Sequence, residues 1–563
     1  MLPVVVLKFG SSVLATATEL PLAVDEVYRR LREGSRVLAV VSAFAGDTDR
    51  LFARAREVLG EEAAPDAVAA FVATGELQSA ALLAGALLRS GVAARMVDPR
   101  EIKLRVEGSA LEADPASVDE VALRALWDEH TTLVLPGFFG IDAQGRVALL
   151  GRGGSDLSAL FIAGTLKCEC HLIKDVAGVF DRDPALDPAG ARRYAVIPWH
   201  EASEVAGPLI QPKALRLAEQ CRTPFTVSRA NGEFETRVAD VATASWGVSQ
   251  EAPVRLRIAL LGCGTVGRGV YERLIAEPDR FELIVVVTRH PARHVANGVP
   301  ESIASDDLHQ AFRADVDLVI EALSGVEPAG SVIEAALMMG KTVVTANKAA
   351  VATYWHEFSA YLAEPDRRLW FGATVGGAVP ILETLGHLRG RVRELRGVVN
   401  GTCNVVLDAI AIASGESFND AVRAAQRSGF AEADPHRDLS GKDSADKLSL
   451  MSHAAFGVHV PSETIRSCGI DDALVAAEPD VWRLLGRARR TSAGVTLGVG
   501  PEQMARTSFL GQTTGAENRL EIVLETGEIV RLAGQGAGRW PTTLAVLGDV
   551  QEIVRRRARA ATP

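Results

Sequence analysis

The sequence predicts a chain of α/β domains, and three observations carry that prediction. Short apolar runs alternate with longer Ala-, Leu- and Arg-rich stretches, a pattern typical of helices layered on a largely parallel sheet. Several glycine-rich turns follow an apolar run and precede a helical stretch. The alternation stops at a short polar segment closed by Pro253 and then restarts, which indicates separate domains. The length of 563 residues agrees, because one domain usually takes about 100–250 residues.

The first half carries the first set of alternating elements. The apolar runs predict strands at 3–9, 36–42, 93–98, 132–136, 171–174 and 225–228. The stretches between them predict helices at 21–33, 49–59, 76–90, 156–166 and 201–220. We assign residues 1–243 to this domain and 244–254 to a linker.

The second half begins with a strand at 257–261, a glycine turn and a helix at 265–276. Further predicted elements are strands at 283–288, 317–323 and 341–345 and a helix at 328–339. From about 368 the pattern becomes mixed α+β, and 548–561 is expected to form an Arg-rich terminal helix. We therefore expect a parallel-sheet domain at 255–367, completed by 545–563, and an α+β domain at 368–544.

The composition limits the partners. The formal net charge of −11 is spread along the chain without a basic or acidic block, which argues against nucleic acid or a membrane surface as partner. No uncharged apolar run approaches the roughly 20 residues of a membrane span, and the start of the chain does not have the pattern of a signal peptide. The six cysteines are dispersed and form no C-x-x-C pair. We expect small-molecule substrates and a reducing cytoplasm.

The run 260–267, L-L-G-C-G-T-V-G, is a G-x-G-x-x-G turn between a strand and a helix. Gly262 permits the tight turn, Gly264 lets the backbone approach a pyrophosphate, and Gly267 lets the helix pack on the strand. Thr265 and Val266 open the helix. This context predicts a nicotinamide dinucleotide site, although a glycine turn alone is a weak signal.

The end of the second strand, at residues 288–290, reads T-R-H, where an NAD site usually has an acid. Arg289, with Arg293 nearby, favours the 2′-phosphate of NADP(H). The alternative is a solvated basic loop.

A polar segment at 429–447 carries the substrate-side chemistry. Asp443 and Lys447 are spaced i,i+4 and therefore share one helix face. Glu432 and Asp438 precede that helix, where carboxylates can hold a substrate ammonium group, and a lysine can protonate a carbonyl oxygen. By itself an Asp/Lys pair at this spacing is usually a surface pair.

The second half resembles homoserine dehydrogenase over 255–555. Shared motifs are the glycine fingerprint, A-N-K at 346–348, G-G-x-x-P at 376–380, N-G-T at 400–402, G-F-A-E-A-D-P at 429–435 and G-A-G at 536–538. The resemblance implies a Rossmann domain and an α+β catalytic domain that reduces aspartate 4-semialdehyde to homoserine, with homodimerisation through the dehydrogenase. It implies catalytic roles for Lys447 and Lys348, cofactor contacts for Ser324 and Asn347, and substrate contacts for Gly401, Thr402, Glu432, Asp438 and Asp443.

One departure concerns a monovalent cation. Family members often carry an acid before the A-x-V-G-G turn, and this chain has Gly372 there. The expected cation site then depends on backbone groups of Val375 and Gly377. A different NADP-linked reductase is an alternative for this half.

The first half has its own set of turns: K-F-G at 8–10, Ser42 to Thr48, Glu76 at a helix start, and L-G-R-G-G-S-D at 150–156. Glycines at a helix N-terminus suit phosphate. In this order the motifs resemble aspartate kinase, of the amino-acid-kinase αβα sandwich, over 3–230. The resemblance implies Mg-ATP-dependent phosphorylation of aspartate. It gives catalytic roles to Lys8 and Asp156, nucleotide contacts to Gly10, Gly153, Gly154 and Asp175, and aspartate contacts to Ser42, Thr48, Glu76, Arg152 and Ser155.

Departures accumulate on the ATP side. Lys174 stands where the family has Thr, Phe180 replaces an aromatic hydroxyl, Ala185 replaces an arginine, and Pro208 replaces a lysine. The family's regulatory ACT domains are missing before the dehydrogenase. Two readings stay open: a bifunctional aspartate kinase and homoserine dehydrogenase, or a dehydrogenase with a catalytically silent kinase-like assembly module.

Overall fold

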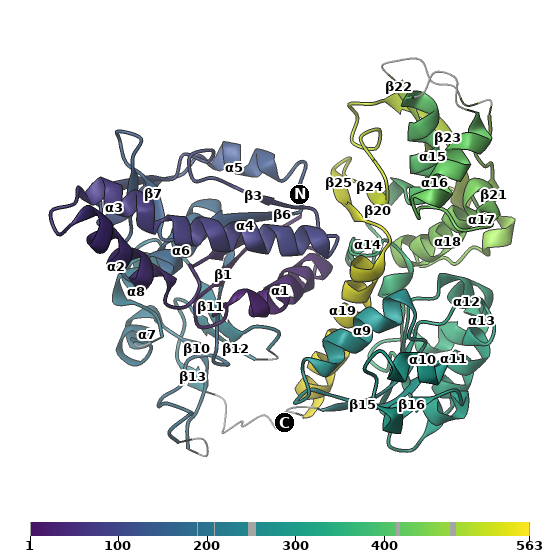
Figure 1. Cartoon of the computed structure of the whole chain (residues 1–563), viewed down its shortest axis with the longest axis horizontal. Coiled ribbons are helices and arrows are strands. Elements are labelled where there is room, and N and C mark those ends of the chain that lie inside the picture. Colours follow the sequence, from purple (N-terminus) through teal and green to yellow (C-terminus); the bar gives the residue numbers. More distant parts are fainter. Residues whose placement is uncertain are drawn as a thin grey trace. The chain divides into compact units, whose positions relative to one another are not determined.

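The computed structural model describes residues 2–187, 190–207, 209–232, 234–245, 255–412, 417–472, 474 and 480–561. Two compact units divide the chain (Figure 1). The N-terminal unit covers Leu2–Arg89, Ala93–Ala252 and Ala558–Pro563, and the C-terminal unit covers Ser90–Val92 and Pro253–Arg557. The change at 252–253 falls in the stretch predicted as a linker, of which 246–254 lies outside the described residues.

The N-terminal unit contains a nine-stranded sheet in the order β13-β10-β12-β11-β9-β1-β2-β6-β3. Its strands are β1 (Val4–Phe9), β2 (Arg36–Val41), β3 (Ala94–Met96), β6 (Thr132–Pro136), β9 (Glu169–Lys174), β10 (Tyr194–Ile197), β11 (Phe225–Arg229), β12 (Glu235–Val238) and β13 (Ala244–Ser245). The central strands β11, β9, β1, β2, β6 and β3 run parallel, as the alternating pattern predicts. A small second sheet contains β4 (Arg105–Ser109), β5 (Glu112–Ser117), β7 (Phe139–Ile141) and β8 (Val147–Leu149).

Helices cover both faces of the nine-stranded sheet. The helices are α1 (Leu20–Arg32), α2 (Asp47–Leu59), α3 (Pro65–Val72), α4 (Thr74–Arg89), α5 (Glu120–Leu126), α6 (Gly154–Leu166), α7 (Trp199–Val205) and α8 (Pro212–Gln220). Helices α6 and α8 pack on each other and share a buried core with alternate residues of β1, β2, β6 and β9. The single helix predicted at 201–220 is two helices, because Pro212 starts a new one at its first turn.

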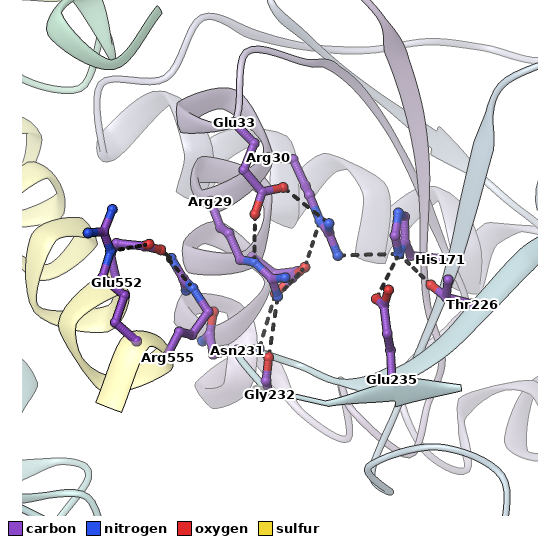
Figure 2. A network of polar contacts seen from close by, with 12 residues as sticks. Arg29, Arg30, Glu33, His171, Thr226, Asn231, Gly232, Glu235, Glu552 and Arg555 are labelled. Carbon is purple, nitrogen blue, oxygen red and sulfur yellow. Dashed lines mark hydrogen bonds and ion pairs between the residues drawn. The ribbon is translucent and has the colours of Figure 1, made fainter. Parts of the chain in front are cut away.

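A network of buried charges joins α1 to the sheet of the same unit (Figure 2). The Glu26 carboxylate accepts hydrogen bonds from Arg29 and Arg30 on its own helix and from the backbone N–H of Asn231. Burial alone would raise the pKa of Glu26, but the two guanidinium groups outweigh it and lower the pKa to about 2. The Arg30 guanidinium lies 3.3 Å from Nδ1 of His171 on β9. Paired in this way, the charges hold α1 in one register on the sheet.

One apolar stretch in the described chain, Pro65–Arg89, has the length and hydropathy of a membrane-crossing helix. The fold buries 56% of its most apolar segment, and mostly buried core helices of other proteins meet the same length and hydropathy criterion. The stretch comprises α3 and α4, and Glu76 lies buried within it.

The C-terminal unit begins with a six-stranded parallel sheet in the order β16-β15-β14-β17-β18-β19. We call this part the dinucleotide domain. Its strands are β14 (Leu256–Leu261), β15 (Phe281–Val287), β16 (Ala304–Ser305), β17 (Leu318–Glu321), β18 (Thr342–Thr345) and β19 (Leu369–Trp370). Its helices are α9 (Thr265–Ile275), α10 (Pro291–Val295), α11 (Ala329–Met338), α12 (Lys348–Thr353) and α13 (Trp355–Phe358). This strand order is that of a Rossmann fold, in which ligands bind at the carboxyl ends of the strands.

The rest of the unit, which we call the catalytic domain, has a mixed sheet in the order β21-β23-β22-β20-β24-β25. Its strands are β20 (Val392–Val398), β21 (Arg466–Ser467), β22 (Asp480–Thr491), β23 (Gly494–Ala505), β24 (Glu517–Leu524) and β25 (Ile529–Gln535). Its helices are α14 (Ile381–His387), α15 (Gly401–Ile412), α16 (Phe418–Arg427), α17 (His436–Leu439) and α18 (Lys442–Phe456). Figure 1 shows α15, α16 and α18 beside this sheet.

The terminal helix α19 (Arg539–Ala561) begins earlier than the predicted residue 548. It returns to the dinucleotide domain, where Arg280 donates a hydrogen bond of 2.6 Å to the Gln551 side chain. A Cβ atom on Gly269 of α9 would lie 2.3 Å from Thr543 Oγ1, so the two helices pack closely at that glycine.

Candidate functional site

The glycine fingerprint forms the tight turn between β14 and α9. Gly262 has φ +91°, and a Cβ there would lie 2.4 Å from the Ala322 carbonyl oxygen. A Cβ on Gly267 would lie 2.0 Å from the Gly262 carbonyl oxygen. A Cβ on Gly264, the N-cap of α9, would have no heavy atom of the other described residues within 4 Å. The first and third glycines are therefore required by the fold, and the second leaves open space where a pyrophosphate can approach.

Three predicted cofactor residues lie at the carboxyl ends of three strands of the parallel sheet. Arg289 follows β15 and donates a 3.4 Å hydrogen bond to Ser324, which follows β17. Asn347 follows β18, caps α12 by accepting from the Ala350 N–H at 3.0 Å, and donates to the Gly325 carbonyl at 2.7 Å. Arg289 and Ser324 are exposed, so both side chains are accessible from solvent. Thr265 and Val266 occupy the first turn of α9.

Below this edge the Glu321 carboxylate is fully buried at the end of β17. It accepts hydrogen bonds from the Leu323 N–H and the Thr345 hydroxyl. Burial raises the pKa of Glu321. This residue was not among the predicted ones, and its contacts hold the loops that carry Ser324 and Asn347 to the ends of β17 and β18.

Lys348 and Lys447 meet on one carboxylate. Lys348 Nζ lies 2.7 Å from Asp443 Oδ1, and Lys447 Nζ lies 2.8 Å from Asp443 Oδ2. Lys447 also donates to the Val399 carbonyl at 2.5 Å. Burial opposes the charge of Lys348, but Asp443 outweighs it and raises the pKa of that lysine. Burial likewise opposes the charge of Asp443, but the two lysines hold its pKa far below the usual range.

The N-G-T segment orients the remaining carboxylate. Asn400 Nδ2 donates to Asp438 Oδ1 at 2.7 Å and to Asp443 Oδ2 at 2.9 Å. The Thr402 hydroxyl lies 3.2 Å from Asp438 Oδ2 and donates to the Phe430 carbonyl at 2.8 Å. The sequence analysis named Asn400 only as part of the N-G-T motif and gave it no role. Its buried amide donates to the carboxylates of both Asp438 and Asp443. An amide that follows an apolar strand and precedes a helix was the available signal.

Other predicted residues lie around this cluster with less contact. Gly401 begins α15, where a Cβ would meet the Ala516 backbone at 2.9 Å. Glu432 is exposed on the loop before α17.

The candidate cation turn is buried. Val375 and Gly377 lie in it, and the Gly372 N–H donates to Asp549 Oδ2 at 2.9 Å. A Cβ on Gly372 would lie 2.4 Å from Glu383 Oε1, so that carboxylate occupies the space of the acid expected at this position. Within the described residues no group of three or more His, Cys, Asp or Glu side chains is arranged to hold a metal ion.

In the N-terminal unit, Lys8 and Asp156 meet a residue that was not predicted. Asp156, in the first turn of α6, lies 2.7 Å from Lys8 Nζ through Oδ1 and 2.9 Å from Lys174 Nζ through Oδ2. Burial, reinforced by Lys174 and opposed by Asp156, lowers the pKa of Lys8 to about 8. Burial opposes the charge of Asp156, but the lysines outweigh it and lower its pKa. The sequence analysis counted Lys174 only as the loss of the family's threonine, although the substitution also adds a positive charge.

The predicted aspartate-side residues begin at Glu76. Its Oε1 accepts a 3.2 Å hydrogen bond from the Ala43 N–H, next to Ser42. Burial raises the pKa of Glu76 to about 7, and its buried Oε2 has no hydrogen-bond partner among the described residues. Thr48 is half-buried on α2. The unsatisfied oxygen fits a donor on a ligand, such as an ammonium group.

The glycine loop before α6 places the remaining residues. Gly153 is the N-cap of α6, and Gly154 and Ser155 are buried in its first turn. Gly10 follows β1, where a Cβ would lie 2.9 Å from Lys8 Nζ. Arg152 and Asp175 are exposed. Of the departures on the ATP side, Ala185 is exposed and Pro208 lies outside the described residues.

Comparison with known proteins assigns the three parts of the chain. Residues 3–227 match the amino acid kinase family, 262–371 match the homoserine dehydrogenase NAD binding domain, and 380–551 match homoserine dehydrogenase. The homoserine dehydrogenase of Synechocystis sp. is 33% identical over 318 residues, which cover 53% of this chain and 73% of that protein. The Neisseria gonorrhoeae enzyme is 30% identical, with 53% and 72% covered.

A solved homoserine dehydrogenase from Thiobacillus denitrificans is 31% identical, with a TM-score of 0.49 and coverage of 55% of this chain and 75% of that one. The amino acid kinase match lies in the N-terminal unit, and both homoserine dehydrogenase matches lie in the C-terminal unit. The chain therefore belongs to the homoserine dehydrogenase family and carries an amino acid kinase domain ahead of its dehydrogenase.

Proposed function

We propose that the C-terminal unit reduces aspartate 4-semialdehyde to homoserine with NADPH. The observation that carries the proposal is the Lys348–Asp443–Lys447 cluster, which joins the dinucleotide domain to the catalytic domain. Two ammonium groups held by one buried carboxylate suit a reaction in which negative charge develops on a carbonyl oxygen. The turn at Gly262–Gly267, with its open space at Gly264, fits a dinucleotide.

The side chains divide the work in this proposal. Lys447 donates a proton to the aldehyde oxygen, and Asp443 holds the lysine in position. Lys348 adds a second positive charge beside the reacting group. Asp438, oriented by Asn400 and Thr402, accepts from the substrate ammonium together with Glu432. The chemistry that a bound NADPH supplies is the hydride that converts the aldehyde carbon to an alcohol carbon.

Two further proposals concern the preference for NADPH and a bound monovalent cation. Arg289, exposed after β15 and close to Ser324, supports binding of the 2′-phosphate of NADPH. The turn containing Val375 and Gly377 offers backbone carbonyls to a monovalent cation, with the Glu383 carboxylate nearby. We further propose a homodimer formed through the catalytic domain, which mass measurement in solution tests, and a cytoplasmic location, which fits six free cysteines.

For the N-terminal unit we propose transfer of the γ-phosphoryl group of Mg-ATP to the side-chain carboxylate of aspartate, which releases ADP. The pair Lys8–Asp156, the turn at Gly10, Gly153 and Gly154, and Asp175 support the nucleotide side. Glu76, with Ser42, Thr48, Arg152 and Ser155, supports the aspartate side. In such transfers positioning and neutralisation of charge provide most of the catalysis.

Two assays on the purified chain test these proposals. NADPH oxidation with aspartate semialdehyde should be rapid, and its absence would overturn the dehydrogenase assignment. With aspartate, Mg-ATP and hydroxylamine, the kinase should form aspartyl hydroxamate. The rival reading, a silent kinase-like module, is supported by the eroded ATP side, including Ala185 and Pro208. It predicts no hydroxamate above background.

A further inference from the structure

Lys174 is a buried charge beside Lys8 and Asp156 that the proposed kinase roles do not use. It ends β9, which pairs in parallel with β1, and Phe9 is the register partner of Ile173. Side chains alternate along strands, so Lys8 follows Val6, and Lys174 follows Leu172, on the face that α6 covers. The fold therefore directs both ammonium groups to the first turn of α6, where Asp156 receives them.

The cluster carries more positive than negative charge. Lys8, Lys174 and Asp156 are 5%, 7% and 4% exposed, and their charges sum to one excess positive charge in a buried site. Excess buried charge is unfavourable unless a counterion offsets it. Burial lowers the pKa of Lys8, and the nearby charge of Lys174 lowers it further. An anion placed against the two ammonium groups would offset the excess positive charge.

The surroundings suit an anion with several oxygens. Gly10 leaves the space beside Lys8 Nζ uncovered, since a Cβ there would lie only 2.9 Å from that nitrogen. The N-terminus of α6, a helix of 13 residues, begins at Gly154 and carries Asp156 in its first turn. Peptide N–H groups at such a terminus favour negative charge and add to the two ammonium groups.

We propose that Lys174 is a second phosphate-binding cation, which together with Lys8 binds the terminal phosphoryl group of a nucleotide. Asp156 holds both ammonium groups in position. In this chain the nucleotide side has Ala185 and Pro208 where an arginine and a lysine are expected. Lys174 supplies one positive charge from the end of β9. The inference rests on the proposed kinase function for its choice of ligand, but binding can be measured without turnover.

The test compares Lys174→Gln with Lys167→Gln in the full chain. Lys167 is an exposed lysine at the end of α6, so its variant controls for net charge. Binding of ADP and ATP, each with Mg²⁺, and of inorganic phosphate is measured by calorimetry. Loss of one charge-assisted hydrogen bond predicts affinity about 10–100-fold weaker for Lys174→Gln. Lys174→Arg should keep most of the affinity, and Lys167→Gln should match the wild type.

A second measurement does not depend on the variants. Because the pKa of Lys8 lies near 8, an anion bound beside it should draw a proton onto that lysine at pH 8. Calorimetry of wild-type protein in two buffers of different ionisation enthalpy should therefore show proton uptake. Such uptake would place the anion beside Lys8, whose ammonium group shares Asp156 with Lys174.

The outcomes separate the inference from the kinase proposal. Nucleotide binding that weakens in Lys174→Gln, without hydroxamate formation by the wild type, supports the inference and overturns the kinase proposal. Hydroxamate formation with unchanged binding in Lys174→Gln does the reverse. A Lys174→Thr variant that binds ATP more tightly than the wild type would show that Lys174 obstructs the site, and would overturn the inference. Failure of the wild type to bind ADP, ATP or phosphate would also overturn it.

Discussion

Lys348 and Asp443 lie 95 residues apart in the chain, yet their charged groups are 2.7 Å apart. Lys348 begins α12 of the dinucleotide domain, and Asp443 lies in the first turn of α18 of the catalytic domain. The contact therefore connects the dinucleotide domain to the catalytic domain at the site. Lys447 contacts the same carboxylate, so one side chain pairs with both lysines.

The first prediction concerns this carboxylate. Asp443→Asn should lower kcat for NADPH-dependent reduction of aspartate semialdehyde by about 10²–10⁴-fold, because the proton donor loses its counterion and its aim. Initial rates at saturating NADPH measure the effect. Asp446→Asn is the matched control: Asp446 is also buried on α18, but it pairs with Arg437. Equal losses in the two variants would contradict a specific role for Asp443.

A second prediction separates folding from cofactor binding at the glycine turn. Gly267→Ala should lower the melting temperature and abolish tight NADPH binding, because its Cβ would lie 2.0 Å from the Gly262 carbonyl oxygen. Gly264→Ala should keep the melting temperature, because no atom lies near its Cβ, but should weaken NADPH binding. Thermal unfolding and fluorescence titration measure the two effects. A Gly264→Ala variant with normal NADPH affinity would show that no phosphate approaches there.

Part of this site could be predicted from the sequence, and the reason is local geometry. The glycine spacing and the i,i+4 pair of Asp443 and Lys447 follow from a turn and a helix, whose geometry is nearly fixed. The contact of Lys348 with Asp443 depends on how two domains pack, and spacing carries no signal of it. Asn400 illustrates the same limit, because its amide joins Asp438 to Asp443 only after the chain has folded.

The N-terminal unit shows a different limit. The six central strands of the large sheet were predicted because their apolar runs are continuous, whereas β4 and β5 were missed because their residues are mostly polar and exposed. Lys174 could be seen in the sequence as a departure from the family motif. Its contact with Asp156 could not, because it depends on the strand placing Lys174, like Leu172, on the face that α6 covers. A substitution that looks like a loss in a motif can thus supply a charge to the same site.

A third prediction tests cofactor preference. Arg289→Ala should raise the KM for NADPH by about 10–100-fold and leave the KM for NADH within a small factor, because only NADPH carries the 2′-phosphate that a guanidinium would bind. Arg313→Ala, an exposed arginine paired with Asp315, is the control for lost surface charge. Equal rises in both KM values would place Arg289 away from the 2′ position.

The last prediction concerns the pH dependence of the kinase. Burial raises the pKa of Glu76 to about 7, and Asp47 adds to that shift. If Glu76 must be ionised to hold the aspartate ammonium, kcat/KM for aspartate is low below pH 7 and rises as the carboxyl group loses its proton. An exposed glutamate, with a pKa of about 4.3, would give a flat profile over this range. A coupled assay of ADP release, run at pH values over about three units from pH 6 to 9, measures this profile.

Asp47→Asn should move the rise to lower pH, because it removes a negative charge that disfavours ionisation of Glu76. A rise that stays in place in Asp47→Asn, or that persists in Glu76→Gln, would assign the titration to another group.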